Sequence, residues 1–279
     1  MDLKDKTILI TGSTDGVGRV VAQRLGADGA RVLVHGRVAA RGKAAVAEIE
    51  SAGGKAEFLA ADLASLAEIR HLAEAVRART NRLDILINNA GIGTAGAKRQ
   101  VSADGYELRF AVNYLAGFLL TSELLPLLKA SAPARIVNVA SAGQQAIDFG
   151  DVMLTHGYSG VRAYCQSKLA QILFTVDLAE QLKGTGVTVN ALHPASYMNT
   201  TMVRQAGVTP WSSVETGAEA IVNLAASPAL AGRSGLYFDG LRETRADAQA
   251  YDARARQQLR KLSLDLIGPA SSKSKDLNS

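Results

Sequence analysis

The chain has 279 residues, of which 47% are hydrophobic and 20% are charged. This composition is typical of a globular protein, and the length suits a single α/β domain. The one cysteine, Cys165, excludes an internal disulfide and fits a reducing environment, so we expect a cytoplasmic protein. The charged start of the chain and the lack of eighteen consecutive apolar residues argue against a signal peptide and a membrane span.

The formal net charge of +5 would suit a nucleic-acid partner if the charge were concentrated on one surface. The arginines are instead scattered along the sequence. The one dense basic group, at residues 254–261, alternates with apolar residues as a surface helix does. We therefore expect no nucleic-acid partner.

Short apolar runs alternate with amphipathic patterns along the whole chain. Strands are expected at residues 7–10, 31–35, 56–60, 83–88, 135–139, 187–192 and 236–238. Helices are expected near residues 17–28, 40–52, 65–79, 103–129, 160–183, 213–226 and 246–262. This alternation predicts a doubly wound parallel sheet of about seven strands, with helices on both faces. We expect one domain over residues 1–269 and a flexible tail at 270–279.

The first expected strand leads into the glycine-rich turn Thr11-Gly12-Ser13-Thr14-Asp15-Gly16-Val17-Gly18 and then into an amphipathic helix. Glycines let the backbone approach a phosphate, and the start of a helix offers free N–H groups and the positive end of its dipole. The spacing G-x-x-x-G-x-G is a variant of the dinucleotide-binding fingerprint. The turn is therefore expected to hold the phosphates of a nucleotide cofactor.

The second expected strand ends in Val34-His35-Gly36-Arg37. Sites for NAD usually place an acidic residue here for the ribose 2′-hydroxyl, whereas a guanidinium suits the 2′-phosphate of NADP. Gly36 stands where the acid would be, and Arg37 follows it. The pattern favours NADP(H) over NAD(H), with a solvated arginine at the start of a helix as the alternative.

Other polar and small residues also follow expected strands. In a doubly wound sheet, ligands bind beyond the carboxyl ends of the strands. The residues at these ends are Gly12, Gly36, Arg37, Asp62, Asn88–Gly91, Ser141 and Pro194. We therefore expect all of them at one edge of the sheet, around one site.

Tyr164 and Lys168 lie four residues apart in a stretch with helical periodicity. Positions i and i+4 share a helix face, so the lysine ammonium can stand near the phenol. A free tyrosine has a pKa of about 10, and a nearby positive charge lowers that pKa. The pair predicts a general acid/base, with an ordinary solvated helix face as the alternative. A second tyrosine, Tyr158, has Arg162 four residues on instead of a lysine.

Four motifs follow one another along the chain: the glycine turn at 11–18, Asn88-Asn89-Ala90-Gly91, Ser141, and Tyr164-x-x-x-Lys168. Together they resemble the short-chain dehydrogenase/reductase family, whose members share a single Rossmann-type NAD(P)-binding domain. The resemblance extends over nearly the whole chain, about residues 5–265.

Within that family, residues 163–170 and 235–238 are most similar to the retinol-dehydrogenase-like branch. Relatives in this branch often carry a membrane anchor, and this sequence departs from them there. Ser141 and Tyr164 are farther apart than is usual in the family, and the branch carries a similar insertion. Residues 143–160 are therefore expected to form an extra loop over the site.

The resemblance implies cofactor contacts from the ends of several strands. The implied residues are Gly12, Ser13, Thr14, Asp15, Gly16, Val17, Gly18, Arg37, Asp62, Leu63, Asn89, Ala90, Gly91, Tyr164, Lys168, Pro194 and Thr200. Asp15 argues against NADP(H), because NADP-binding relatives often have a basic residue there. Asp62 would bind the adenine amine, unless it or Ser65 serves only to cap the helix at 65–79. Asn88 would make structural hydrogen bonds.

The family's threonine after the sixth strand has two candidates here. Asn199 falls at the usual distance from Pro194, whereas Thr200 fits only if one residue is inserted. We favour Thr200, because its hydroxyl suits a place near the nicotinamide or pyrophosphate.

The resemblance also implies a proton relay. Ser141 would hold the reacting oxygen, Tyr164 would transfer the proton, and Lys168 would bind the ribose hydroxyls. Asn113 would bend the helix after the fourth strand and anchor a water that links the lysine to solvent. The expected activity is NADP(H)-dependent hydride transfer between an alcohol and a ketone, and no metal is expected.

Two alternatives are weighed against this activity. A cofactor-binding interaction protein without catalysis usually lacks the tyrosine or the lysine, and both remain here. Sugar-nucleotide epimerases space their glycines differently. Assembly as a homo-oligomer is left open.

The expected substrate is a small apolar molecule of retinoid, steroid or polyketide type. The segments at 143–160 and 195–235 would line its pocket. They carry the apolar side chains of Phe149, Met153, Tyr197, Met198, Met202 and Trp211, although such side chains are often part of the core.

Overall fold

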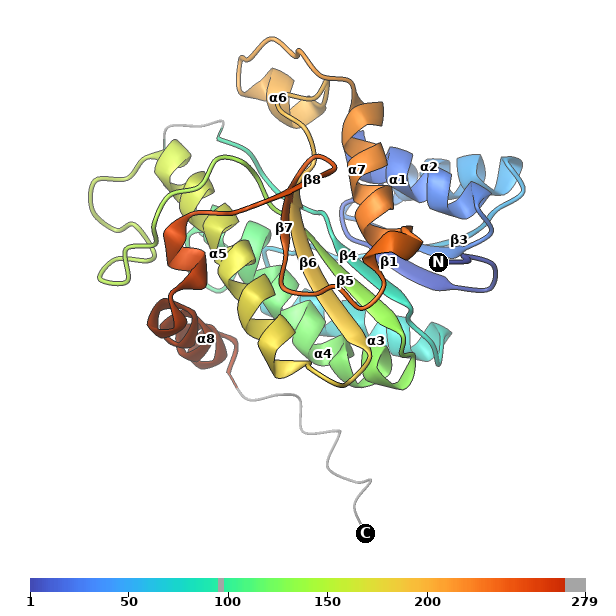
Figure 1. Cartoon of the computed structure of the whole chain (residues 1–279). Helices are drawn as coiled ribbons and strands as arrows, with labels where there is room; N and C mark the ends of the chain where they lie inside the picture. Colours follow the sequence, from blue (N-terminus) through green and yellow to red (C-terminus); the bar gives the residue numbers. More distant parts are fainter. Residues whose placement is uncertain (95–97, 269–279) are drawn as a thin grey trace.

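The computed structural model describes residues 1–94 and 98–268, so the tail expected at 270–279 lies outside the described residues. One sheet runs through the molecule in the order β3-β2-β1-β4-β5-β6-β7-β8 (Figure 1). The strands from β3 to β7 are parallel, and β8 is antiparallel to β7. Their bounds are β1 Thr7–Ile10, β2 Arg31–Gly36, β3 Lys55–Ala60, β4 Ile85–Asn88, β5 Ala134–Val139, β6 Val187–His193, β7 Tyr237–Asp239 and β8 Arg242–Thr244.

Helices cover both faces of this sheet (Figure 1). One face is covered by α1 (Gly16–Ala27), α2 (Ala39–Ser51) and α7 (Val214–Ala226). The other is covered by α3 (Leu66–Arg79), α4 (Ala116–Ala130), α5 (Gly160–Gln181) and α8 (Ala253–Ile267). The short helices are the π-helix η1 (Phe110–Leu115), α6 (Thr201–Gln205), η2 (Pro228–Leu230) and η3 (Ala248–Tyr251). The doubly wound, single-domain α/β fold predicted from the sequence is confirmed.

Successive side chains of a buried strand point to opposite faces of the sheet, so the core has two layers. In β1, Leu9 packs into the layer beneath α3, α4, α5 and α8, while Ile8 and Ile10 pack into the layer beneath α1, α2 and α7. All four β1 residues are buried, as expected for a parallel strand covered on both faces. The sheet is thus a rigid platform for the loops at its carboxyl edge.

Serine side chains start three of the helices. Ser65 accepts a hydrogen bond from the backbone N–H of Glu68, Ser159 does the same for Arg162, and Ser213 caps α7. A capped start satisfies N–H groups that have no partner within the helix. Each cap therefore fixes where a helix begins relative to the loop before it.

Each expected strand occurs within two residues of its predicted bounds, but the sheet has an eighth strand that was not predicted. Strand β8 is short and polar, and it forms by pairing with β7 rather than from any pattern of its own. The helix expected at 103–129 begins only at Phe110, as η1. The helix expected at 246–262 is replaced by η3 and the later α8. Helix α6 was not predicted.

The helix that continues from η1 into α4, Phe110–Ala130, is long and apolar enough by composition to cross a membrane. In the fold, 61% of its most apolar window is buried, as in the core helix of a globular protein. The basic group of α8 is also partly internal. Arg256, expected on a helix surface, is buried and pairs with Glu180 at 2.9 Å.

Candidate active site

The glycine turn after β1 is shaped by close backbone packing. Gly12 and Gly16 have φ values of +65° and +54°, which side-chain-bearing residues rarely adopt. A Cβ atom at Gly12 would lie 2.9 Å from Cα of Ala90, and one at Gly18 would lie 2.4 Å from the Gly12 carbonyl oxygen. The turn therefore packs directly on the end of β4 and on the start of α1.

Side chains around this turn hold it from within. Asn89 donates its amide to the carbonyls of Thr11 and Gly12, at 2.8 and 3.1 Å. The Thr11 hydroxyl accepts from the backbone N–H groups of Asn89 and Ala90, and the buried Ser13 hydroxyl donates to Ile10 at 2.7 Å. The side chains of Ser13 and Asn89, predicted to contact the cofactor, are thus engaged within the protein.

His35 is a further support of the turn that the sequence analysis did not assign. Its Nδ1 accepts from the Gly12 backbone N–H at 3.1 Å, and its Nε2 lies 3.2 Å from the Ala61 carbonyl oxygen. These contacts fit the neutral tautomer with the proton on Nε2. Burial lowers the pKa of His35 to about 4, so the ring is neutral at pH 7. The signal in the sequence was a histidine within an apolar strand.

The end of β2 has no room for an acidic side chain. A Cβ atom at Gly36 would lie 2.7 Å from the side chain of Thr14. Arg37 follows and is largely exposed, with its guanidinium 3.9 Å from Asp62.

A second arginine, Arg41 at the start of α2, lies at the same end and was not predicted. Its guanidinium is 3.8 Å from the carboxylate of Asp15. Asp15 caps α1 through the Gly16 N–H and also accepts from the Thr201 hydroxyl at 3.0 Å. A carboxylate at position 15 therefore has a structural use: it joins the glycine turn to α6.

The cap of α3, one of the two roles considered for Asp62, belongs to Ser65. Ser65 caps α3, whereas the Asp62 carboxylate accepts from the Ala64 N–H at 3.0 Å and stays partly exposed. Asn88 behaves as predicted for a structural residue, since its buried amide donates to Thr121 at 3.1 Å and Asn138 at 2.9 Å.

Ser141 and Tyr164 meet beyond the end of β5. Both lie beside Gly143, where a Cβ atom would be 3.5 Å from Oγ of Ser141 and 3.6 Å from the Tyr164 ring. Burial raises the pKa of Tyr164, and the nearby Ser141 hydroxyl opposes this rise only in part. The phenol is therefore protonated at neutral pH.

Lys168 lies one helical turn farther along α5, and its Nζ is 5.8 Å from the centre of the Tyr164 ring. The ammonium donates to the Val139 carbonyl at 2.8 Å and to Gln171 Oε1 at 3.0 Å. Burial lowers the pKa of Lys168 to about 7. The expected lowering of the tyrosine pKa by this lysine is not found, because desolvation dominates at both groups.

Asn113 connects the helix after β4 with α5. It sits in the π-helix η1, a form of helix that often marks functional sites. Its amide donates to Ile92 O at 3.1 Å and to Ser167 Oγ at 2.9 Å, and Ser167 donates to the Tyr164 carbonyl at 2.7 Å. Gly91 borders the same space, since a Cβ there would be 3.3 Å from Asn113 and 3.5 Å from Lys168 Nζ.

Thr200 lies nearer to the glycine turn than Asn199 does, and its hydroxyl caps α6. The methyl group of Thr200 lies 3.4 Å from the Cβ position of Gly16, so it reaches the glycine turn. The Asn199 side chain instead accepts from Arg204 at 2.6 Å, on the surface. Which of the two residues takes the family's threonine role stays a prediction.

The sequence model of the short chain dehydrogenase family matches residues 6–210. The chain belongs to the short-chain dehydrogenase/reductase family. Its curated relatives include human retinol dehydrogenase 13, which is 38% identical over 283 residues, with 94% of this chain and 85% of the relative covered. Human retinol dehydrogenase 12 is 36% identical over 281 residues, with 96% and 88% covered. Both relatives agree with the predicted branch.

Solved structures show the same fold. The NADP complex of RhlG from Pseudomonas aeruginosa superposes with a TM-score of 0.71 at 30% identity, covering 85% of this chain and 95% of that one. The landomycin C-6 ketoreductase LanV, with bound NADP and rabelomycin, gives a TM-score of 0.68 at 28% identity, covering 86% and 96%. This short-chain dehydrogenase/reductase is thus an oxidoreductase with an NAD(P)-binding domain.

The insertion of this dehydrogenase/reductase, residues 143–160, is an ordered loop beside the site. Ile147 and Leu154 are buried, and Gln249 of η3 bonds both backbone groups of Ile147. Phe149 and Met153, expected to line a substrate pocket, pack partly buried against the core. This packing agrees with the alternative that such side chains belong to the core.

The segment after β6 presents a different set of apolar side chains. Tyr197 and Trp211 are 49% and 73% exposed, with ring centres 5.3 Å apart. Met202 lies against Gly93, and Met198 packs on Gly217 of α7. In this segment the rings of Tyr197 and Trp211 are exposed, whereas Met198 and Met202 are partly buried. Within residues 1–94 and 98–268, no three His, Cys, Asp or Glu side chains gather as a metal site would require.

Proposed function

We propose that this short-chain dehydrogenase/reductase interconverts apolar alcohols and carbonyl compounds with NADP(H), using Ser141, Tyr164, Lys168 and Asn113 as its proton relay. The observation that carries the proposal is that Ser141 and Tyr164 both border Gly143 at the carboxyl edge of the sheet, with Lys168 one helical turn beyond Tyr164. A cofactor-binding protein without catalysis would have no use for this arrangement. Cytoplasmic localisation remains a prediction.

The glycine turn supports a bound dinucleotide. Glycines at positions 12, 16 and 18 place no side chains of their own over the turn, and the start of α1 offers the positive end of its dipole, which suits a pyrophosphate. When bound, the nicotinamide supplies or accepts the hydride. The protein then has to hold the reacting oxygen and move one proton.

Tyr164 is suited to donate that proton in the direction of reduction. Because burial raises its pKa, the phenol keeps its proton at neutral pH. Ser141 steadies the same oxygen, and Lys168, whose pKa is lowered to about 7, exchanges protons easily near neutral pH. Asn113 fixes α5 relative to η1, and the oxidation of an alcohol follows the same route in reverse.

NADP(H) is the proposed cofactor because of the end of β2. Thr14 fills the space that an acidic residue at position 36 would need, and both Arg37 and Arg41 carry positive charge there. A guanidinium binds a phosphate well through paired hydrogen bonds. The NADP complexes of RhlG and LanV are in agreement with this preference.

An apolar substrate is proposed from the segments at 143–160 and 195–235. The exposed rings of Tyr197 and Trp211 and the side chain of Met202 lie on the second of these segments. The relatives named retinol dehydrogenase 12 and 13 make a retinoid the first substrate to try.

The replacement Tyr164→Phe tests the proposal. Loss of the proton donor should lower turnover of all-trans-retinal with NADPH by about 10²- to 10⁴-fold, while NADPH affinity changes little. Tyr106→Phe is the matched control, because the Tyr106 hydroxyl donates to Leu266 O, away from the site. Stopped-flow turnover and fluorescence titration measure the two quantities. Turnover of Tyr164→Phe within threefold of the parent would exclude this tyrosine as the acid.

A further inference from the structure

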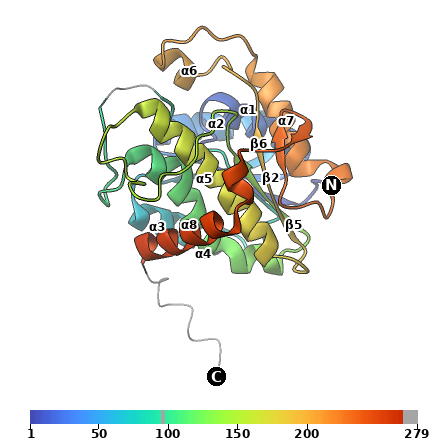
Figure 2. The same cartoon turned by 60° about the vertical axis from the view of Figure 1, so that its left-hand side comes forward.

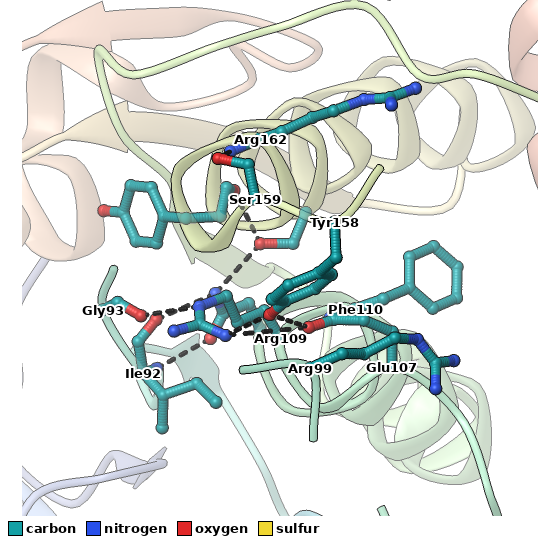
Figure 3. Close-up of polar contacts among 12 residues, drawn as sticks. Ile92, Gly93, Arg99, Glu107, Arg109, Phe110, Tyr158, Ser159 and Arg162 are labelled. Carbon is teal, nitrogen blue, oxygen red and sulfur yellow. Dashed lines mark hydrogen bonds and ion pairs between the residues drawn. The ribbon is translucent and has the colours of Figure 1, made fainter. Parts of the chain in front are cut away.

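Two buried charged residues and a tyrosine of the insertion form a cluster beside the relay (Figure 3). Glu107 and Arg109 precede η1, and their side chains are 1% and 4% exposed, with 3.8 Å between their charged groups. The Tyr158 hydroxyl lies between them: it accepts from Arg109 at 2.5 Å and donates to Glu107 at 3.0 Å. Burying charges is costly unless they are paired and hydrogen-bonded, so the geometry of such a cluster is closely constrained.

The cluster holds the insertion at two points. Tyr158 is one end of the insertion, immediately before Ser159, which caps α5. Near the middle of the insertion, Met153 accepts at its sulfur from the Glu107 N–H at 3.4 Å. Glu107 also accepts from the N–H of Phe110, the first residue of η1, at 2.7 Å. One carboxylate therefore ties the loop over the site to the helix that carries part of the relay.

From Arg109, contacts continue through Gly93 and Ile92, both labelled in Figure 3, to Asn113 of the relay. Arg109 Nε donates to the Gly93 carbonyl at 2.8 Å. The preceding residue, Ile92, donates its N–H to Asn113 Oδ1 at 2.7 Å and accepts from the Asn113 amide. Asn113 in turn reaches the backbone of Tyr164 through a serine, as described above. The chain of contacts is continuous from the insertion to the catalytic helix.

We propose that Glu107, Arg109 and Tyr158 are positioning residues of the reaction: they lock the insertion against the Ile92–Gly93 segment and so hold Asn113 in register with α5. This inference rests on the proposed function, because the lock acts through the relay. The proposal assigns Tyr158 a positioning role. The hydroxyl is not a second proton donor, since Arg109 and Glu107 engage it, and Arg162 pairs with Asp148.

The replacement Tyr158→Phe removes only the bridging hydroxyl. Glu107 and Arg109 remain paired with each other, but the insertion loses its hydrogen bonds to both side chains and keeps only the contact of Met153 with the Glu107 N–H. A reacting group displaced by about 1 Å can lose up to about 10²-fold in rate. We expect turnover of all-trans-retinal to fall about tenfold in Tyr158→Phe, with NADPH affinity within twofold of the parent.

Tyr106→Phe is again the matched control. It lies next to Glu107 in sequence and loses one partly buried hydroxyl bond, to Leu266 O, outside the cluster. Its turnover should stay within twofold of the parent. Equal losses in both variants, in step with their melting temperatures, would overturn the proposal, because they would show general loosening of the fold.

A double-mutant cycle tests transmission through Asn113. If the lock acts through Asn113, Tyr158→Phe should cost less than twofold when added to Asn113→Ala, although it costs about tenfold in the parent. Independent effects would instead multiply. Multiplying losses would overturn the proposed route.

Amide hydrogen exchange provides a readout that does not need turnover. The Ile92 N–H is protected by its bond to Asn113, so Tyr158→Phe should speed its exchange severalfold, and Tyr106→Phe should not. Unchanged exchange at Ile92 in Tyr158→Phe would overturn the lock. A parent enzyme that reduces no ketone or aldehyde would defeat the proposed function, and the exchange result would still decide whether the lock exists.

Discussion

The glycine turn keeps its shape through side chains that point into the protein. His35, Ser13 and Asn89 each hydrogen-bond the turn or the strand beneath it, at distances from 2.7 to 3.1 Å. The nucleotide would then meet mainly backbone, which binds phosphate through N–H groups. The family motif indicates the glycine turn as a segment. Only the hydrogen-bond partners show which of the side chains around it hold the turn in shape.

The neutral state of His35 predicts a dependence of stability on pH. Burial lowers its pKa from 6.5 to about 4 in the folded protein, so below pH 6.5 the unfolded chain binds a proton that the folded one does not. The contribution of His35 to the free energy of unfolding is fully present above pH 6.5. It decreases by about 3 kcal/mol as the pH falls to about 4.

Urea unfolding between pH 7.5 and 4 measures this loss. The variant His35→Gln should be less stable at pH 7.5 but should show a smaller decline on acidification. His156→Gln is the control, because the His156 side chain is 93% exposed. Parallel declines for the parent and His35→Gln would show that His35 is not the group responsible.

The position of Arg37 after β2 predicts that the protein prefers NADPH to NADH. Removing its guanidinium in Arg37→Ala should weaken NADPH binding by about tenfold, as expected for a charge-assisted hydrogen bond of about 1.5 kcal/mol, and leave NADH binding nearly unchanged. Fluorescence titration with each reduced cofactor measures both affinities. Arg242→Ala, at a site that is also exposed but lies on β8, is the control. Tighter NADH than NADPH binding by the parent, or unchanged NADPH affinity in Arg37→Ala, would contradict the preference.

The elements of the fold were largely predictable because each strand and most helices carry their own periodicity. The apolar strands 7–10 and 135–139 were placed within a residue of the structure. Elements that depend on contacts were not predictable: β8 needs β7 beside it, and α6 needs its contact with Asp15. The sequence predicted that the motif residues lie on the loops at the carboxyl edge of the sheet, but it could not predict the pKa of Tyr164, because that pKa depends on burial.

Residues 146–156 of the insertion, whose replacement leaves Tyr158 in place, are expected to affect substrate binding and not cofactor binding. The insertion bonds to Gln249 and to the residues before η1, and none of its hydrogen bonds among the described residues reaches the glycine turn. Replacing residues 146–156 by a Gly/Ser linker should raise KM for all-trans-retinal by about tenfold, equivalent to losing about 1.4 kcal/mol of contact, while NADPH affinity stays within twofold. Loss of NADPH affinity with an unchanged KM would assign the loop to the nucleotide site instead.

At the scale of the whole molecule, α8 completes one layer of the core. It packs across α5 (Figure 2), where Arg260 pairs with Asp177 at 3.1 Å. The hydroxyls of Tyr114 and Ser263 meet at 2.6 Å between η1 and α8. The helix that ends the described chain is therefore bonded to both helices that carry the relay, so its packing contributes to the rigidity of the site.

Leu259 of α8 provides the test of this contribution. Its side chain is 1% exposed within the layer beneath α3, α4, α5 and α8, so Leu259→Ala should lower the free energy of unfolding by about 2–5 kcal/mol. Leu264 lies on the same helix but is 51% exposed, and Leu264→Ala should change it by less than about 0.5 kcal/mol. Both variants keep the same helix propensity, so the difference isolates burial. Urea unfolding at pH 7.5 compares them, and equal stabilities would mean that α8 is not part of the cooperative core.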